Sequence, residues 1–590
     1  MQEKEIESRT LLELRKLEID TLEEKILKLS KEVKEKDNLI KGLQHEIKEK
    51  DKILRKFFSP RQLDRLLKQK KTQWHKDDIA DAISLRGIAT KAYLYLKEIK
   101  EFPYPSLATL KRWSAKFKLK PGLDNSAILL MKAWGETLSE RERLTVLTFD
   151  ETYLSEDIAY DPSEDKIVGG KTVQVVMARG LTGNWKQPIY FDFDQEMTRH
   201  IFESLVKELY QAGFIVVAAT SDMGSTNRGF WTDMGINVKK TWLSHCCNEN
   251  LKIFIFADVP HLIKLLRNHF LDQGFLFPWL QKFISRKALD ELLTVSSSSD
   301  LKIAHKLTKQ MLDVQGSARQ RVSPATKLFS RKMANALALS GLRGHIKHSN
   351  YEYLSAFIRL VNNWFDLHNS VSLFGKHEGV NAYCGSDGQK KILDDMTLVM
   401  KNMRVEPHQS CLPFQNGIII SNESLKGLYD YVRSTYGVQY IITRRLNQDI
   451  LESFFGYIRS MGRAYDHPSA LQFIYRMRLY ILSKHSSTVF SQKTNCQQEK
   501  LPDVTTVTAM WDHERGEKCD DDFESDELDV FPDIVPSSDL MHKAFEDDPL
   551  TENEIREEED SEIQLSIMDV PEDMFLDFDL LEDFEKKQVF

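Results

Sequence analysis

Apolar segments alternate with turns between residues 144 and 222, in an order that few folds can accommodate. Two of the segments end in an aspartate: LTVLTF is followed by Asp150, and FIVVAATS is followed by Asp222. Short apolar runs bounded by turn residues are typical of buried strands, whereas apolar residues spaced by three and four predict a helix. The sequence predicts strands at 144–150, 166–180, 186–194 and 214–222, and a helix at 197–213 that ends at Gly213.

Three strands, a helix and a fourth strand follow one another in the order of a ribonuclease-H-like core. In that fold the first and fourth strands are neighbours, so we expect Asp150 and Asp222 to lie side by side. A third carboxylate, Glu452, comes much later, in the segment QDILESFFGYIR, whose pattern predicts a helix. Each of the three alone is equally compatible with an ordinary solvated side chain, and only their combination with this strand order points to a site.

Hard carboxylate oxygens are the ligands that Mg²⁺ prefers in proteins. Two divalent ions about 4 Å apart can activate an attacking oxygen and stabilise a leaving oxygen on phosphorus. We therefore predict an α/β enzyme in which Asp150, Asp222 and Glu452 are both the catalytic residues and the ligands of Mg²⁺ or Mn²⁺.

The N-terminal segment, residues 8–58, has a heptad pattern. Its apolar residues follow one seam in alternating steps of three and four, and most other positions are charged. Sustained heptads predict a coiled coil through which the chain forms a homo-oligomer, in preference to a lone amphipathic helix packed on the body. Arg15, Lys36 and Lys50 interrupt the seam, whose apolar members are Leu12, Ile19, Leu22, Ile26, Leu29, Val33, Ile40, Leu43, Ile47 and Leu54.

Residues 70–122 are predicted to form a compact helical module. Pro103 and Pro105 break the chain, and Ser106 is a suitable N-cap for a helix whose residues Leu107, Leu110 and Trp113 share one face. This is the pattern of a helix-turn-helix recognition helix, although small helical modules without a role in DNA binding share it. The outward-facing residues that we predict to contact DNA are Thr109, Lys111, Arg112 and Lys116.

The predicted core is interrupted. Residues 259–440 are mainly helical by pattern, and they separate Asp222 from Glu452. We therefore predict a ribonuclease-H-like core in two parts, 140–258 and 441–489, around a helical insertion domain. Residues 490–590 are acidic and poor in periodic pattern, which predicts a largely disordered tail.

Charge is distributed unevenly along the chain. The formal net charge is −8, but residues 512–590 carry −24 and residues 1–511 carry +16. A basic body with an acidic tail is compatible with nucleic-acid binding. The sequence has no apolar stretch that could span a bilayer and no signal-peptide pattern, and its six cysteines contain no CxxC pair. These features predict a protein of the cytosol or nucleus that has no membrane partner.

Two further motifs are weaker. GGKT at 169–172 resembles part of a phosphate-binding loop, but such a loop requires glycine where Asp165 stands, and the segment lies between predicted strands. His245, Cys246 and Cys247 suggest a metal site, but adjacent residues rarely converge on one zinc ion and no second ligand pair follows at the usual spacing. We predict a β-turn at the first motif and no metal at the second.

Five segments, in order, resemble the P element transposase family, which includes relatives that carry a THAP zinc finger. The coiled-coil segment and the helical module resemble the family as well, so that the resemblance covers residues 10–485. The five segments are LTFDETYL, SDMGSTNRGFW, ADVPHLIKLLRN, NWFDLHNS and LNQDILESFFGYIR.

This resemblance implies a DNA transposase. It makes Asp150, Asp222 and Glu452 the acidic triad that uses Mg²⁺ for DNA hydrolysis and strand transfer, and it makes the insertion a GTP-binding domain. GTP in this family assists assembly with DNA and is not hydrolysed. The residues that the resemblance assigns to the nucleotide are Lys264, Asp366, Asn369, Asp449 and, more weakly, Asp258.

The family's N-terminal zinc finger has no counterpart here, because the chain starts just before the coiled-coil segment. We therefore expect a nuclear transposase that acts on double-stranded DNA with a metal ion and GTP. Two other functions are compatible with the sequence. One is a domesticated, non-catalytic dimeric regulator that binds DNA, and the other is an interaction scaffold built on the coiled coil and the acidic tail.

Overall fold

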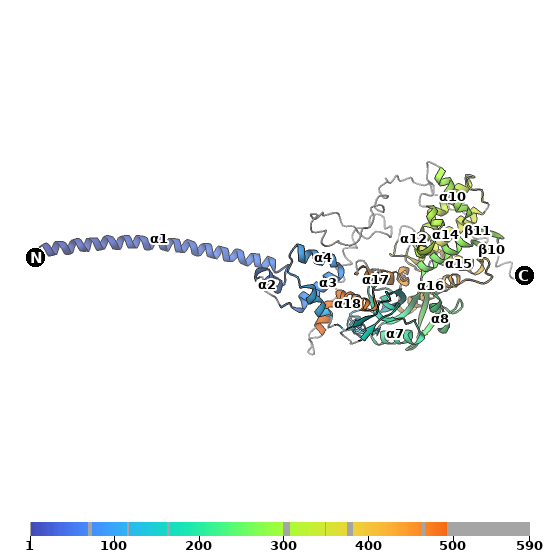
Figure 1. The fold of residues 1–590 in the computed structure, drawn as a ribbon, viewed down its shortest axis with the longest axis horizontal. Helices are drawn as coiled ribbons and strands as arrows, with labels where there is room; N and C mark the ends of the chain where they lie inside the picture. Colours follow the sequence, from blue (N-terminus) through green and yellow to red (C-terminus); the bar gives the residue numbers. More distant parts are fainter. Residues whose placement is uncertain are drawn as a thin grey trace.

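The computed structural model describes residues 2–68, 73–114, 117, 119–161, 166–298, 307–348, 350–374, 381–461 and 467–492. The predicted acidic tail lies outside the described residues from residue 493 onward, and so does Lys116 of the predicted DNA-contacting helix. A long N-terminal helix extends away from a body that contains a central sheet and a group of helices beyond one of its edges (Figure 1).

A seven-stranded sheet forms the centre of the body, in the order β1-β6-β5-β2-β7-β9-β8. Strand β2 is antiparallel to β5 and parallel to β7, and β7 is parallel to β9, which confirms the predicted pairing of the first and fourth core strands. The sequence analysis missed β8 and β9, which complete the sheet beyond residue 222. The strands of this sheet are β1 (Gly122–Leu123), β2 (Leu144–Tyr153), β5 (Thr172–Gly180), β6 (Lys186–Phe193), β7 (Ile215–Ser221), β8 (Trp242–His245) and β9 (Asn248–Ala257).

Helices account for most of the remaining chain, and two small hairpins complete the fold. The hairpins are β3 (Ala159–Asp161) with β4 (Lys166–Val168), and β10 (Phe275–Phe277) with β11 (Lys282–Ile284). The helices are α1 (Gln2–Leu54), α2 (Pro60–Lys68), α3 (Lys76–Ile88), α4 (Thr90–Leu94), η1 (Tyr95–Ile99), α5 (Leu107–Ser114), α6 (Asn125–Gly135), α7 (Arg199–Gln211), α8 (Ser225–Asp233), α9 (Val259–Asp272), α10 (Lys287–Ser298), α11 (Lys309–Leu312), η2 (Gly316–Gln320), α12 (Ser323–Leu328), α13 (Arg331–Leu342), α14 (Tyr351–His368), α15 (Asp387–Asn402), α16 (Pro413–Tyr436), η4 (Thr443–Leu446), α17 (Asp449–Ser460) and α18 (Ala470–Gln492).

The two faces of the sheet support two hydrophobic cores. The larger core joins α7, α9, α16 and the insertion helices to one face. The second core joins α17, α18 and the N-terminal helical module to the other face, with Val175 and Met177 of β5 buried beneath them. Successive residues of a strand point to opposite faces, so β5 supplies both cores at once.

Helix α16 packs unusually closely on β9. An added Cβ at Gly427 would lie 2.6 Å from a ring carbon of Phe254, so only glycine permits this approach. The Ser424 hydroxyl, one turn away, donates a hydrogen bond to the Ile255 carbonyl at 2.6 Å. Glycine within a helix costs roughly 1 kcal/mol relative to alanine, and here the close contact offsets that cost.

The predicted coiled-coil segment forms the single long helix α1. Its seam is uncovered in the single chain: Ile26 and Ile47 are 64% and 65% exposed. The helix projects from the body and does not fold back on it (Figure 1). Self-association through this seam remains a prediction.

The helical module that precedes the sheet packs against α18, because α3 and α18 share the second core. Ser106 caps α5 as expected, since its hydroxyl accepts a hydrogen bond from the Thr109 amide at 3.1 Å. Lys111 and Arg112 are exposed, whereas Thr109 is half-buried and contacts the Ser106 hydroxyl at 2.9 Å. Thr109 is therefore less available to a partner than the sequence suggested.

The insertion is mainly helical, as predicted, and also contains the β10–β11 hairpin. Its helices α10, α12, α14 and α15 group together beyond the edge of the sheet (Figure 1). The predicted strand 166–180 is divided into β4 and β5, and GGKT spans their connection and the first residue of β5, not the start of a helix. Among the described residues, no helix is long and apolar enough to cross a bilayer.

Candidate active site

The two strand-end aspartates lie beside one another. Thr148 of β2 pairs in parallel register with Thr220 of β7, so Asp150 and Asp222, each two residues further on, come to the same edge of the sheet. Their carboxylates are close enough for Asp222 to raise the pKa of Asp150. The prediction that strand order brings these two residues together is confirmed.

Asp222 is held in one orientation. Its Oδ1 accepts hydrogen bonds from the Gly224 amide at 3.0 Å and from Asn227 Nδ2 at 2.6 Å. Its other oxygen, Oδ2, lies 3.9 Å from His261 Nδ1. One oxygen is thus committed to the protein, and the other faces the site.

Glu452 reaches the site because the start of α17 is fastened to the sheet. Gln448, directly before the helix, donates from Nε2 to the Phe149 carbonyl at 2.6 Å. Its backbone amide donates to Asp258 Oδ1 at 2.8 Å. The first of these bonds joins positions 299 residues apart and ends one residue before Asp150. Glu452, one turn into α17, is therefore brought to the aspartates by Gln448.

Asp258 also anchors the start of α17 to the sheet. Its amide donates to the Ser221 carbonyl at 2.9 Å, directly before Asp222, and its carboxylate caps α9 by accepting from the His261 amide at 3.0 Å. The side chain is 2% exposed, and each of its two oxygens accepts a protein hydrogen bond. Asp258 thus links α9, α17 and the strand that carries Asp222. Both of its oxygens take part in holding these segments together.

Burial and mutual repulsion perturb the acids of the site. Burial, together with repulsion from Asp222 and Glu452, raises the pKa of Asp150 to about 7. Burial also raises the pKa of Asp258 to about 8 and, together with repulsion from Asp449, raises the pKa of Glu452. Acids that repel one another in a partly buried cleft are stabilised by a cation.

Lys264 is one such cation within the protein. It is 5% exposed, and burial lowers its pKa, while attraction to Asp258, Glu452 and Asp222 opposes that shift. Lys264 therefore lies near these three carboxylates, and its assignment to the nucleotide stays a prediction.

A divalent ion fits the chemistry of this donor set. Asp150, Asp222 and Glu452 supply hard oxygen ligands from two strand ends and one helix, and Asp222 has a fixed orientation with one oxygen facing the site. Mg²⁺ is commonly bound by one or two carboxylates together with substrate phosphates.

Three of the nucleotide candidates lie where the end of α14 meets the start of α17, and Asp449 is near enough to the acidic site to add to the effect of burial on the pKa of Glu452. Asp366 lies in the last turn of α14 and accepts a hydrogen bond from Asn362 Nδ2 at 2.8 Å, and Asn369 directly follows the helix. Asn447 Nδ2 donates to Asn369 Oδ1 at 3.3 Å, which brings the start of α17 to the end of α14. Asp449, two residues after Asn447, pairs with Arg444 at 2.7 Å.

Sequence reasoning missed Gln448 and His261 as members of the acidic site. Gln448 could have been noticed as the residue at the start of the helix that carries Glu452. His261 lies one turn after Asp258 in the segment ADVPHLIKLLRN. No sequence pattern indicates which of these polar residues turns inward, because that depends on how α9 and α17 meet across 190 residues of chain.

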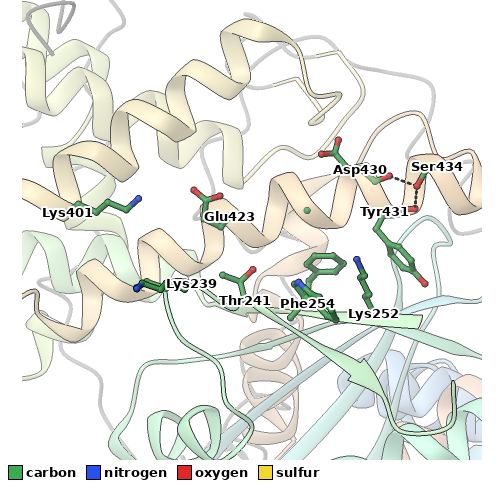
Figure 2. A pocket seen from close by; sticks show the side chains of 12 residues that line it. Lys239, Thr241, Lys252, Phe254, Lys401, Glu423, Asp430, Tyr431 and Ser434 are labelled. Carbon is green, nitrogen blue, oxygen red and sulfur yellow. Dashed lines mark hydrogen bonds between the residues drawn. The ribbon is translucent and has the colours of Figure 1, made fainter. Parts of the chain in front are cut away.

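A separate trough of about 560 Å³ lies between α16 and the β8–β9 edge of the sheet. Figure 2 shows Lys239 and Lys401 toward one end of it and Lys252 toward the other, below Glu423 and Asp430 of α16. None of the three lysines forms an ion pair within the described part of the chain, whereas Glu423 is paired with a fourth lysine, Lys426, at 3.1 Å.

Comparison with known proteins resolves the identity of this fold. Three family models match: the "TNP-like, RNase H N-terminal domain" at residues 119–235, the "TNP-like, GTP-binding insertion domain" at 260–381, and the "TNP-like, RNase H C-terminal domain" at 445–477. The solved structure titled "Drosophila P element transposase strand transfer complex" superposes with a TM-score of 0.70 and 37% sequence identity. That match covers 74% of this chain and 98% of the other. The chain belongs to the P element transposase family.

Curated relatives agree with this assignment to the P element transposase family. The "Transposable element P transposase" of Drosophila melanogaster is 39% identical over 434 residues, which cover 73% of this chain and 57% of the relative. The "DNA transposase THAP9" of Homo sapiens is 24% identical over 429 residues, 66% of this chain and 46% of that protein. The chain thus spans about half the length of the curated relatives that it matches.

Proposed function

We propose that this member of the P element transposase family is a DNA transposase that cleaves transposon ends and joins them to target DNA, with a divalent metal and with GTP as an assembly cofactor. The observation that carries the proposal is the parallel pairing of β2 with β7, which brings Asp150 and Asp222 to one edge of the sheet, with the start of the Glu452 helix hydrogen-bonded beside them. The similar structure is a strand transfer complex, which supports the same reaction class.

Each residue has a separate task in this account. Asp150, Asp222 and Glu452 would hold Mg²⁺ or Mn²⁺, which would supply activation of the attacking oxygen and neutralisation of charge on phosphorus. Asn227 and the Gly224 amide orient Asp222. Gln448 and Asp258 position Glu452 against the strand ends.

Double-stranded DNA is the proposed partner, in the nucleus. Lys111 and Arg112 of α5 are exposed for phosphate contacts. The trough of Figure 2 adds three lysines that no described carboxylate neutralises. The exposed seam of α1 supports a homo-oligomer.

GTP is proposed to bind where the end of α14 meets the start of α17. Asp366, Asn369 and Asp449 supply acceptors there, and the match to a GTP-binding insertion domain supports the assignment. For Lys264 and Asp258, which the resemblance also assigns to the nucleotide, we propose a role at the acidic site, because both are buried and Lys264 is attracted to Asp258, Glu452 and Asp222. Asp449 accepts the Arg444 hydrogen bond at Oδ2, and its carboxylate has further lone pairs with which to accept from the nucleotide.

A plasmid cleavage assay with Mg²⁺ and GTP tests the catalytic assignment. We expect wild type to cleave DNA that carries transposon ends, and Asp150→Asn, Asp222→Asn and Glu452→Gln not to cleave it. If all three variants cleave like wild type, the assignment is wrong. Wild type that binds this DNA but cleaves with neither Mg²⁺ nor Mn²⁺ would favour the non-catalytic regulator instead.

A further inference from the structure

The turn between β8 and β9 brings three metal-binding side chains together. The ligand atoms of His245, Cys246 and Cys247 all lie within 4.8 Å of one another. The two cysteine sulfurs are 3.8 Å apart. The sequence argued against a site here because adjacent residues rarely converge on one zinc ion, and adjacent side chains in a strand point to opposite faces. The turn removes that alternation, so the expectation that these residues would not converge is wrong.

Ordinary structural roles do not account for these residues. Two-residue hairpin turns favour glycine, asparagine and aspartate, yet Cys246 and Cys247 occupy both positions of this turn. Free cysteine is among the most frequently buried residue types, yet both are exposed. Neither the turn conformation nor core packing therefore explains two cysteines at this position.

The histidine gives a second, independent observation. His245 is 1% exposed, and its Nδ1 accepts a hydrogen bond from the Cys247 amide at 3.1 Å. Its Nε2 is buried with no hydrogen-bond partner in the part of the chain that the structure describes. Because Nδ1 accepts this hydrogen bond, Nδ1 has the lone pair of the neutral ring and Nε2 has the proton, so Nδ1 is the nitrogen that faces the turn and would bind a metal ion in place of the Cys247 amide. The ring is held in place by Tyr210 of α7, at 5.0 Å between ring centres.

We propose that His245, Cys246 and Cys247 form a binding site for a thiophilic divalent metal ion of the zinc class. Two sulfurs at about 2.3 Å from a tetrahedral zinc ion lie about 3.8 Å apart, which is the separation observed here. Thiolate and imidazole ligands select zinc over magnesium, so this site and the acidic site bind different ions.

The position of the turn indicates what the ion does. Cys246 Sγ lies 3.6 Å from the Glu203 carbonyl of α7, so the ligand set sits where the edge hairpin meets that helix. A bound ion fastens the β8–β9 edge, and three protein ligands leave one coordination position open. The hairpin also forms one wall of the trough that contains Lys239 and Lys252.

Metal titration of the full-length, reduced protein in excess Mg²⁺ tests the site, since Mg²⁺ occupies the carboxylates and not thiolates. Wild type is expected to retain one equivalent of Zn²⁺ after dialysis and to develop a thiolate charge-transfer absorption with Cd²⁺. Cys246→Ser/Cys247→Ser loses both signals. The matched control is Cys384→Ser/Cys411→Ser, which removes two other free cysteines and keeps both signals.

Three results would overturn the proposal. They are wild type without the thiolate band, a Cys246→Ser/Cys247→Ser variant that retains the ion, and mass spectrometry that shows these two cysteines joined as a disulfide in the protein as purified. Because both cysteines are exposed, the double variant is expected to fold, and circular dichroism checks this. None of these readouts requires DNA cleavage, so the zinc site and the transposase proposal can fail separately.

Discussion

The acidic site and the nucleotide-candidate group lie at the same helix, α17, but are built differently. The acidic site is fastened by backbone-directed hydrogen bonds from Gln448 and Asp258 to the segments that carry Asp150 and Asp222. The nucleotide group rests on side-chain contacts, including an ion pair whose arginine is 47% exposed. The difference predicts that the acidic site is preorganised and that the proposed nucleotide group rearranges when GTP binds.

The largest expected effect is on DNA cleavage, and it distinguishes the acidic site from the nucleotide-candidate group. Asp222→Asn is expected to reduce DNA cleavage by about 10³-fold or more, because several kcal/mol of charge stabilisation are lost. GTP affinity, measured by calorimetry, should be unchanged. The exposed Asp233→Asn is a matched control and should cleave normally. A large loss of GTP affinity in Asp222→Asn would mean that the two regions are one site.

Gln448→Ala tests the fastening of α17. We expect roughly 10–100-fold slower cleavage, the range typical of residues that orient metal ligands, and a higher Mg²⁺ requirement. A merely destabilised protein would lower the melting temperature without raising that requirement. Gln211→Ala, at an exposed glutamine, is the control. An unchanged Mg²⁺ requirement in Gln448→Ala would contradict the positioning role.

The same contrast shows which parts of the fold and of the acidic site could be predicted from the sequence. Strand order places Asp150 and Asp222 together, because parallel neighbours end at the same edge, and this part was confirmed. The contacts of Gln448 and Lys264 depend on how α9 and α17 pack after a long insertion, and no local pattern encodes that packing. Convergence at the His245–Cys247 turn was missed for a related reason, since strand periodicity fails at a turn.

Asp366→Ala is expected to weaken GTP binding about tenfold, because a hydrogen bond that involves a charged group contributes roughly 1.5–3 kcal/mol. Lys264→Met, which keeps the side-chain length, should leave GTP affinity unchanged and slow cleavage, since Lys264 lies among the acids. Calorimetry measures the GTP affinity of both variants, and the plasmid cleavage assay measures the cleavage rate of Lys264→Met. Loss of GTP binding in Lys264→Met would return that residue to the nucleotide site.

The trough should contribute to DNA affinity through charge alone. Replacing Lys239, Lys252 and Lys401 with glutamine is expected to weaken non-specific duplex binding several-fold. It should also reduce the slope of log K against log salt by about 0.9 for each DNA phosphate that the protein no longer neutralises. Fluorescence anisotropy at several salt concentrations measures both. An unchanged slope would show that the trough does not face DNA.

The smallest expected effect is on stability in the absence of metal. The folded pKa values of Asp150 and Asp258, about 7 and 8, lie above the unfolded value near 3.9, so the folded state binds more protons and loses stability as pH rises. The buried His261 and His368 have pKa values lowered to about 4. Below pH 6.5 these two histidines therefore make the folded state more stable as pH rises. In EDTA the melting temperature should therefore fall by a few degrees between pH 6.5 and 8. Asp150→Asn should flatten this fall, and a rise over the window would contradict the assignment.

The central claim is that three carboxylates from distant parts of the chain form one metal site. Mn²⁺ titration followed by electron paramagnetic resonance tests it most directly, with wild type compared to Asp150→Asn, Asp222→Asn and Glu452→Gln. We predict that wild type binds Mn²⁺ in competition with Mg²⁺ and that each substitution weakens binding at least about tenfold while the fold is retained. Equal Mn²⁺ affinity in wild type and all three variants would contradict the account.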